Sequence, residues 1–196
     1  MNSKKIYILN FLCIVLLQII NANTTNAQIS VGLRTGINSL MIQKGYFNTD
    51  KNVSSTSWSQ QIFTNWKIGK RFLLEANLTH ASLNNDVIIG NTPYTTNVKE
   101  QYYNGSCLIS YKIWTVQKFD LYGGIGIGTY NHTSSTTHES SFSIDAPSGI
   151  IALTASYNIH KNFFLTGQPF YSYLLSSSSN AAISNIGWNI GLGYKF

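Results

Sequence analysis

Large apolar side chains alternate with small or polar ones along much of the chain, most cleanly near its end. There, one set of alternate positions holds Ile186, Trp188, Ile190, Leu192, Tyr194 and Phe196, and the other holds Asn185, Gly187, Asn189, Gly191, Gly193 and Lys195. Successive side chains of a β-strand point to opposite faces. The segment therefore predicts a strand with one apolar face. That face either packs against a second layer or meets lipid while the small, polar face lines a lumen.

The same alternation predicts about eight strands. They cover residues 29–38, 58–68, 72–79, 100–113, 121–130, 151–159, 163–173 and 185–196. The second and the seventh are the least regular, and the alternation leaves the facing of their side chains open.

The connections between these segments alternate in length. Short ones lie at residues 69–70, 115–118 and 160–162, and longer ones, rich in Ser, Thr and Asn, lie at 43–56, 84–97, 131–141 and 176–184. Strict alternation of this kind is typical of an even-stranded up-and-down barrel. The predicted fold is all-β, an eight-stranded antiparallel up-and-down transmembrane β-barrel. Its short turns are expected at the periplasmic rim and its long loops outside.

Glycine recurs on the small face of two predicted strands. The positions are Gly124, Gly126 and Gly128 in the fifth strand and Gly187, Gly191 and Gly193 in the eighth. Glycine weakens a strand, so a run of it on one face needs a steric reason. A narrow lumen, with room only for small residues beside a few large ones, supplies that reason.

Aromatic residues are expected to gather where strands meet the short connections. Tyr and Trp favour the depth of the lipid headgroups, where an apolar ring and a polar edge are both satisfied. The predicted girdle consists of Trp66, Phe72, Tyr111, Trp114, Tyr157, Phe163, Tyr194 and Phe196.

The first 27 residues predict a secretory signal peptide. Lys4 and Lys5 precede an apolar stretch, residues 6–20, and small residues lead to Ala27, a plausible cleavage point. The apolar stretch is short for a spanning helix. The domain prediction is therefore a signal peptide over residues 1–27 and a barrel over 28–196. Cleavage would leave Cys107 as a single cysteine that cannot form an internal disulfide.

Composition agrees with a barrel. Charged residues make up 10% of the chain, against about 25% in typical soluble domains. Lys and Arg number 13 and Asp and Glu number 7. Without Lys4 and Lys5 the surplus falls to four charges, which we interpret as too small and too scattered for a nucleic-acid partner.

Taken together, these features resemble the small outer-membrane β-barrel proteins of Gram-negative bacteria, the OmpA-like and OmpX-like barrels, in a Bacteroidetes-type form. The residues that carry the resemblance are the predicted signal, the strand at 121–130 and the terminal strand. The resemblance implies a monomer in the cell outer membrane, surrounded by lipid. It also implies an assembly signal, read by the barrel-assembly machinery during insertion, at Trp188, Tyr194 and Phe196.

Three charged residues fall on predicted lumen faces: Arg34, Glu75 and Glu100. A buried charge without a partner costs several kcal/mol. They are therefore expected to pair with one another or with water in a lumen polar cluster, with Arg34 paired to a carboxylate. The cluster either plugs the barrel or lines a narrow ion-conducting pore.

Catalysis has one weak candidate. Some outer-membrane barrels, the lipid A deacylases, resemble this chain in a His-x-Ser element, here His132 and Ser134, with Glu139 nearby. A Ser nucleophile needs a base and an orienting acid within reach. A Ser- and Thr-rich loop can contain such a triplet by chance. The alternation also places His132 on the lumen side, whereas the site of the deacylases faces lipid. The chain is therefore predicted not to be an enzyme.

The sequence contains no nucleotide-binding loop or metal-ligand spacing, and no cofactor or metal is expected. The function expected first is structural or surface interaction, with extracellular loops serving adhesion, protection or partner binding. The alternatives are a lipid A deacylase-like acyl hydrolase, a narrow pore, and a soluble carrier of the lipocalin type, whose apolar faces would point inward.

Overall fold

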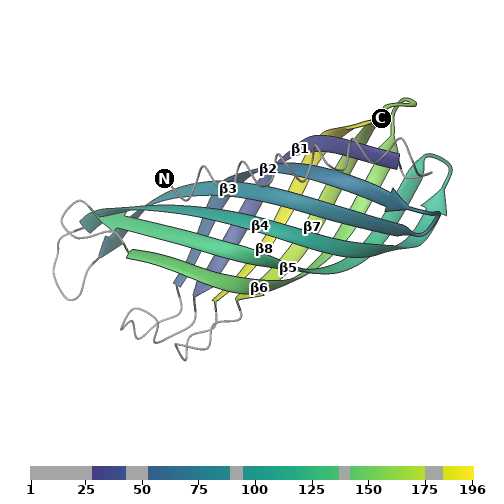
Figure 1. Ribbon diagram of the computed structural model, residues 1–196. Helices are drawn as coiled ribbons and strands as arrows, with labels where there is room; N and C mark the ends of the chain where they lie inside the picture. Colours follow the sequence, from purple (N-terminus) through teal and green to yellow (C-terminus); the bar gives the residue numbers. More distant parts are fainter. Residues whose placement is uncertain (1–27, 43–52, 89–94, 137–141, 175–182) are drawn as a thin grey trace, which may run out of the picture.

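The computed structural model is a closed antiparallel barrel of eight strands in chain order (Figure 1). It describes residues 28–42, 53–88, 95–136, 142–174 and 183–196, with side chains omitted at some strand ends. The strands are β1 (Gln28–Ile42), β2 (Val53–Ile68), β3 (Phe72–Ile88), β4 (Thr95–Val116), β5 (Phe119–Thr136), β6 (Phe142–Asn158), β7 (Phe163–Leu174) and β8 (Ile183–Lys195). The predicted fold class is confirmed. Within the described residues, no helix has the length and apolar character needed to cross a membrane.

Pairing of β1 with β8 closes the sheet, so every strand has two neighbours and the sheet has no edge. Following paired residues once around the barrel from Val31 leads back to β1 at Met41. This ten-residue stagger tilts the strands by about 40°. Because of the tilt, residues far apart in the sequence meet in the lumen.

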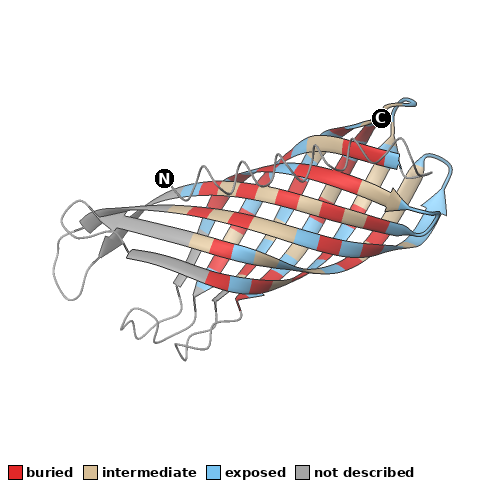
Figure 2. Ribbon diagram, viewed as in Figure 1, coloured by how far each residue is buried: buried red, intermediate tan, exposed pale blue. Residues whose placement is uncertain are grey.

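Alternate residues of each strand face the lumen or the outside, as the pattern of exposure along the ribbons shows (Figure 2). The terminal strand is representative: Ile186, Trp188 and Ile190 are 49%, 58% and 50% exposed, whereas Asn185 and Asn189 are buried. The apolar face of β8 therefore points outward, and a soluble carrier with inward apolar faces is excluded. Two positions with outward parity, Ile29 and Thr64, depart from the pattern and are buried.

Several strands extend further than the alternation predicts. β5 continues to Thr136, six residues beyond its predicted end, and β4 starts at Thr95, five residues before its predicted start. The apolar alternation is needed only where one face meets lipid. Beyond that depth both faces of a strand can be polar while backbone pairing continues. The strands therefore extend past the residues in which apolar and polar positions alternate.

Three short turns lie together at one end of the barrel, at residues 69–71, 117–118 and 159–162 (Figure 1). We call this end, with Gln28 and Phe196, the short-turn rim. Gly69 and Gln117 have positive φ values of 60° and 49°. This conformation suits glycine and reverses the chain over few residues.

The aromatic residues predicted beside the short turns stand on the outer face there, and we refer to them as the girdle. Phe72, Trp114 and Phe196 are 45%, 55% and 64% exposed. Neighbouring girdle rings pack edge to face, as in Phe72 with Tyr111 and Phe163 with Tyr194, at 5.4 and 5.2 Å between centroids. Several girdle rings therefore stabilise one another in contacting pairs.

Candidate functional site

The lumen contains a buried ion pair between β1 and β3. Arg34 Nη2 lies 2.8 Å from Glu75 Oε2, and Nη1 donates to Oε1 at 3.1 Å. The two side chains are 0% and 1% exposed. Two parallel bonds of this kind fix both position and orientation, and they are stronger than bonds between neutral groups.

Side chains from β3 and from three other strands, β2, β6 and β7, complete the surroundings of the ion pair. Gln61 and Gln168 accept from Arg34 Nη1 at 2.9 and 3.0 Å, and the Phe63 ring lies 4.0 Å from the guanidinium carbon. Asn77 Nδ2 donates to Glu75 at 2.9 Å. The remaining members are Thr79, Thr154 and Thr166. We call this set the lumen network. Its members come from β1, β2, β3, β6 and β7, so it ties opposite walls of the barrel together.

An apolar group closes the lumen on the side away from the short turns. Tyr102 and Tyr130 stack with their ring centroids 5.5 Å apart, and both are buried. The group consists of Leu40, Ala81, Tyr102, Tyr130, Ala146 and Leu174. Asn38 Nδ2 donates to the Tyr102 hydroxyl, so this group also joins the polar layer.

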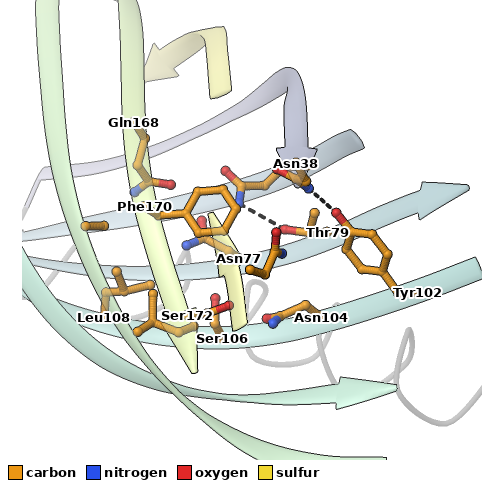
Figure 3. Close-up of a pocket in the computed structure, with 14 residues that line it drawn as sticks. Asn38, Asn77, Thr79, Tyr102, Asn104, Ser106, Leu108, Gln168, Phe170 and Ser172 are labelled. Carbon is orange, nitrogen blue, oxygen red and sulfur yellow. Dashed lines mark hydrogen bonds between the residues drawn. The ribbon is translucent and has the colours of Figure 1, made fainter. Parts of the chain in front are cut away.

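Between the lumen network and the apolar group lies a cavity of about 20 Å³, lined by Asn38, Asn77, Ser172 and Asn185 among others (Figure 3). A single buried water needs about 10–15 Å³ measured in this way. The cavity therefore has room for roughly one water molecule and none for a metabolite. Figure 3 shows the hydrogen bond between Asn38 and Tyr102 at one boundary of the cavity. At another boundary Gln61 donates to the Thr79 hydroxyl at 3.0 Å.

The structure does not bring Glu100 to the ion pair. Glu75 pairs with Leu108 across the β3–β4 ladder, eight positions from Glu100 along β4. At about 3.4 Å per residue this is about 27 Å along the strand. The grouping of Glu100 with Arg34 and Glu75 is therefore corrected: equal parity places residues on one face but says nothing about their height in the barrel.

The residues of the catalytic alternative lie at the far end of β5 or beyond it. His132 pairs with Tyr102 and Ile144, and Ser134 pairs with Glu100 and Phe142, but their side chains are outside the described part. Glu139 lies outside the described residues altogether. Among the residues that the structure describes, no group of three His, Cys, Asp or Glu side chains is placed to hold a metal ion.

The terminal-strand residues of the predicted assembly signal are all exposed on the outer face. Trp188, Tyr194 and Phe196 are 58%, 38% and 64% exposed, and the Tyr194 and Phe196 rings lie 5.2 Å apart. Their role in assembly stays a prediction.

The sequence of residues 11–196 matches the family of the outer membrane protein beta-barrel domain. The chain belongs to this family. This outer-membrane barrel is therefore an integral protein of the outer membrane, as expected from the sequence. No curated protein sequence matches it.

Solved structures share the fold of this outer-membrane barrel at low sequence identity. Neisserial surface protein A is 14% identical with a TM-score of 0.59, covering 88% of this chain and 100% of its own. A major outer membrane protein from Thermus thermophilus is 12% identical with a TM-score of 0.59 and covers 88% and 100%. Ail, the attachment invasion locus protein of Yersinia pestis, crystallised with the heparin analogue sucrose octasulfate, is 16% identical with a TM-score of 0.54 and covers 86% and 99%.

Sequence reasoning missed the partners that surround the ion pair. Gln61 and Phe63 lie on the inward face of β2, as Asn65 does. The prediction of this strand rests on its outward residues and does not consider the inward ones. Listing every inward polar residue together with Arg34 would have found Gln61. Their contact with Arg34 depends on the stagger of the barrel, which the period of a single strand does not contain.

Proposed function

We propose that this outer-membrane barrel is non-catalytic, does not conduct, and acts through its rims, with the long-loop end outside the cell serving adhesion, protection or partner binding. The observation that supports the proposal is the filled lumen. The Arg34–Glu75 pair and the stacked Tyr102 and Tyr130 close it in two layers, and the space between them fits about one water molecule. We further propose that the protein works as a monomer and is inserted by the barrel-assembly machinery through β8.

The outer partner is proposed to differ in chemistry from the heparin analogue in the Ail crystal. A polyanion needs a basic surface. The strand ends and connections away from the short turns carry Lys44, Lys51 and Lys99 against Asp50, Asp86, Glu100, Glu139 and Asp145. This excess of acidic residues disfavours a sulfated polysaccharide at that end and favours a neutral or basic partner.

Replacing residues 43–52 and 137–141 by Gly–Ser sequences of equal length is expected to abolish the attachment of cells that express the protein to other cells. The barrel itself is expected to stay intact. The strand ladder is formed by residues up to Ile42 and Thr136 and again from Val53 and Phe142, so the replacements leave all described strand residues unchanged. Attachment of cells expressing the parent or the variant to a host-cell layer would be counted, with a heated-versus-unheated gel shift to verify folding.

Attachment equal to the parent would contradict the role of the loops. Mass spectrometry of lipid A from the same cells tests the catalytic alternative. An acylation pattern that changes on expression of the parent, and reverts in a Ser134→Ala variant, would replace the non-catalytic proposal.

Purified protein in planar lipid bilayers is expected to give the same current as protein-free bilayers. An ion crossing the lumen would have to displace both the lumen network and the stacked tyrosines. Bilayers exposed to the same detergent without protein are the control, and reproducible stepwise currents would contradict a closed lumen.

A further inference from the structure

The basic residues of this barrel gather at the short-turn rim, contrary to the scattered distribution expected from the sequence. They are Lys67, Lys70, Arg71, Lys112, Lys118, Lys161 and Lys195. Within the part of the chain that the structure describes, Asp120 is the one acidic residue at this rim. The rim therefore has an excess of six positive side-chain charges, whereas the chain without Lys4 and Lys5 has an excess of four.

Three of these side chains share the inward parity and stand at the mouth of the lumen. Lys112 Nζ lies 2.9 Å from Asp120 Oδ1, and Lys195 donates to Asn158 Oδ1. Lys67 lines an open hollow with Lys70 and Lys112. Because two of the three already have partners within the protein, the mouth is the less available part of the basic rim.

The other four basic residues lie on the short turns and are exposed: Lys70, Arg71, Lys118 and Lys161. Neither of the two salt bridges among the described residues includes any of them. Arg71 Nη1 donates to the Tyr111 hydroxyl at 3.0 Å. Tyr111 belongs to the girdle, so this guanidinium lies on the outer, lipid side of the wall.

The position of these charges relative to the girdle identifies their partner. Tyr and Trp rings lie at the depth of the lipid headgroups, and the four residues directly follow the girdle toward water. Phosphate groups of lipids occupy this depth. Basic side chains attract anionic lipids there, and the guanidinium of Arg71 has donors left for a phosphate.

We propose that the short-turn rim binds anionic phospholipid headgroups through Lys70, Arg71, Lys118 and Lys161. The assignment to the periplasmic leaflet rests on the proposed orientation, with long loops outside. Each charge at this depth contributes about a fivefold preference for an anionic over a zwitterionic lipid. The four turn residues act as separate contacts, so the rim selects a class of lipid rather than one molecule.

Tryptophan quenching by brominated lipids tests this proposal directly. In a Trp58→Phe, Trp188→Phe background, the remaining Trp66 and Trp114 lie two residues before the ends of β2 and β4, next to the short turns. In vesicles of phosphatidylcholine with a minor fraction of brominated lipid, brominated phosphatidylglycerol is expected to quench about fivefold more effectively than brominated phosphatidylcholine. The preference is expected to weaken in 1 M salt.

Three variants separate the contribution of the turns from that of the mouth. Changing all four turn residues to Gln is expected to make brominated phosphatidylglycerol and brominated phosphatidylcholine quench almost equally. The charge-conserving variant K70R, R71K, K118R, K161R is expected to retain the preference for phosphatidylglycerol. A Lys67→Gln, Lys195→Gln variant at the mouth is expected to retain it as well. Equal quenching by both lipids in the parent, or loss of preference in the mouth variant alone, would overturn the proposal.

The assay is independent of the loop function. Both leaflets of these vesicles have the same composition, so the orientation of the barrel does not affect the result. A heated-versus-unheated gel shift verifies that each variant has inserted. A negative result would therefore leave the proposed role of the long loops untouched.

Discussion

Replacing Glu75 by Gln is expected to lower the free energy of unfolding by about 3–5 kcal/mol. The substitution keeps size and shape but leaves the guanidinium of Arg34 buried without a counter-charge, in a side chain that is 0% exposed. The amides of Gln61 and Gln168 accept hydrogen bonds but carry no charge to offset it. Urea unfolding in phospholipid vesicles, followed by tryptophan fluorescence, would measure the loss.

A second ion pair among the described residues, Lys112 with Asp120, is a matched control. Asp120 contacts Lys112 at the same kind of distance, 2.9 Å, but the two side chains are 15% and 17% exposed. Asp120→Asn is expected to cost about 1 kcal/mol or less because water screens the remaining charge. Removing both buried partners, with Arg34→Met and Glu75→Leu, is expected to recover most of the loss. Equal small effects of E75Q and D120N would show that Arg34 reaches water.

Gly191→Val is expected to prevent closure of the barrel, whereas Gly167→Val leaves assembly unchanged. A Cβ at Gly191 would overlap the carbonyl oxygen of Leu33 and approach Arg34 Cα and Cγ at 2.7 Å, so the backbones of β1 and β8 would have to separate. Gly167, on the outer face of β7, has no atom within 4 Å of the same position. The fraction of protein with a heat-dependent gel shift, after refolding into vesicles, measures closure.

Valine favours strands more than glycine does, so propensity alone would stabilise both variants. The comparison therefore isolates the steric effect of the lumen side. If both variants assemble to the same extent, the close approach at Gly191 is not required for closure. Loss of assembly in both would instead indicate that the β7–β8 region tolerates no change.

The faces of the strands follow from the sequence because lipid imposes a period of two on the membrane-spanning part of each strand. Arg34 and Glu75 were identified as lumen residues in this way. A carboxylate partner for Arg34 is also predicted, but which carboxylate it is, and which neutral side chains surround the pair, depends on how far each strand is shifted against the next. Glu100 illustrates the limit: it has the right parity, but it is displaced along β4.

A charge count over the whole sequence does not reveal the basic rim. Lys70, Lys118 and Lys161 are about 45 residues apart in the chain, and each looks like a single charge in a turn. The up-and-down order of the strands, which the sequence predicts and the structure confirms, returns every second connection to the same end. The rim therefore becomes visible when charges are summed for each end of the barrel rather than over the whole chain.

Closure of the barrel by β1 and β8 has a consequence for the order of folding. Val31 pairs with Tyr194 across this seam, so the final ladder joins opposite ends of the described chain. Contacts between such distant residues form slowly, because a long loop must be ordered first. Arg34 can meet Glu75 within the β1–β3 meander, but Thr166 and Gln168 of β7 reach it only when the circle is complete. The last step of folding therefore both removes the open edges of the sheet and completes the hydrogen bonds of its buried cation.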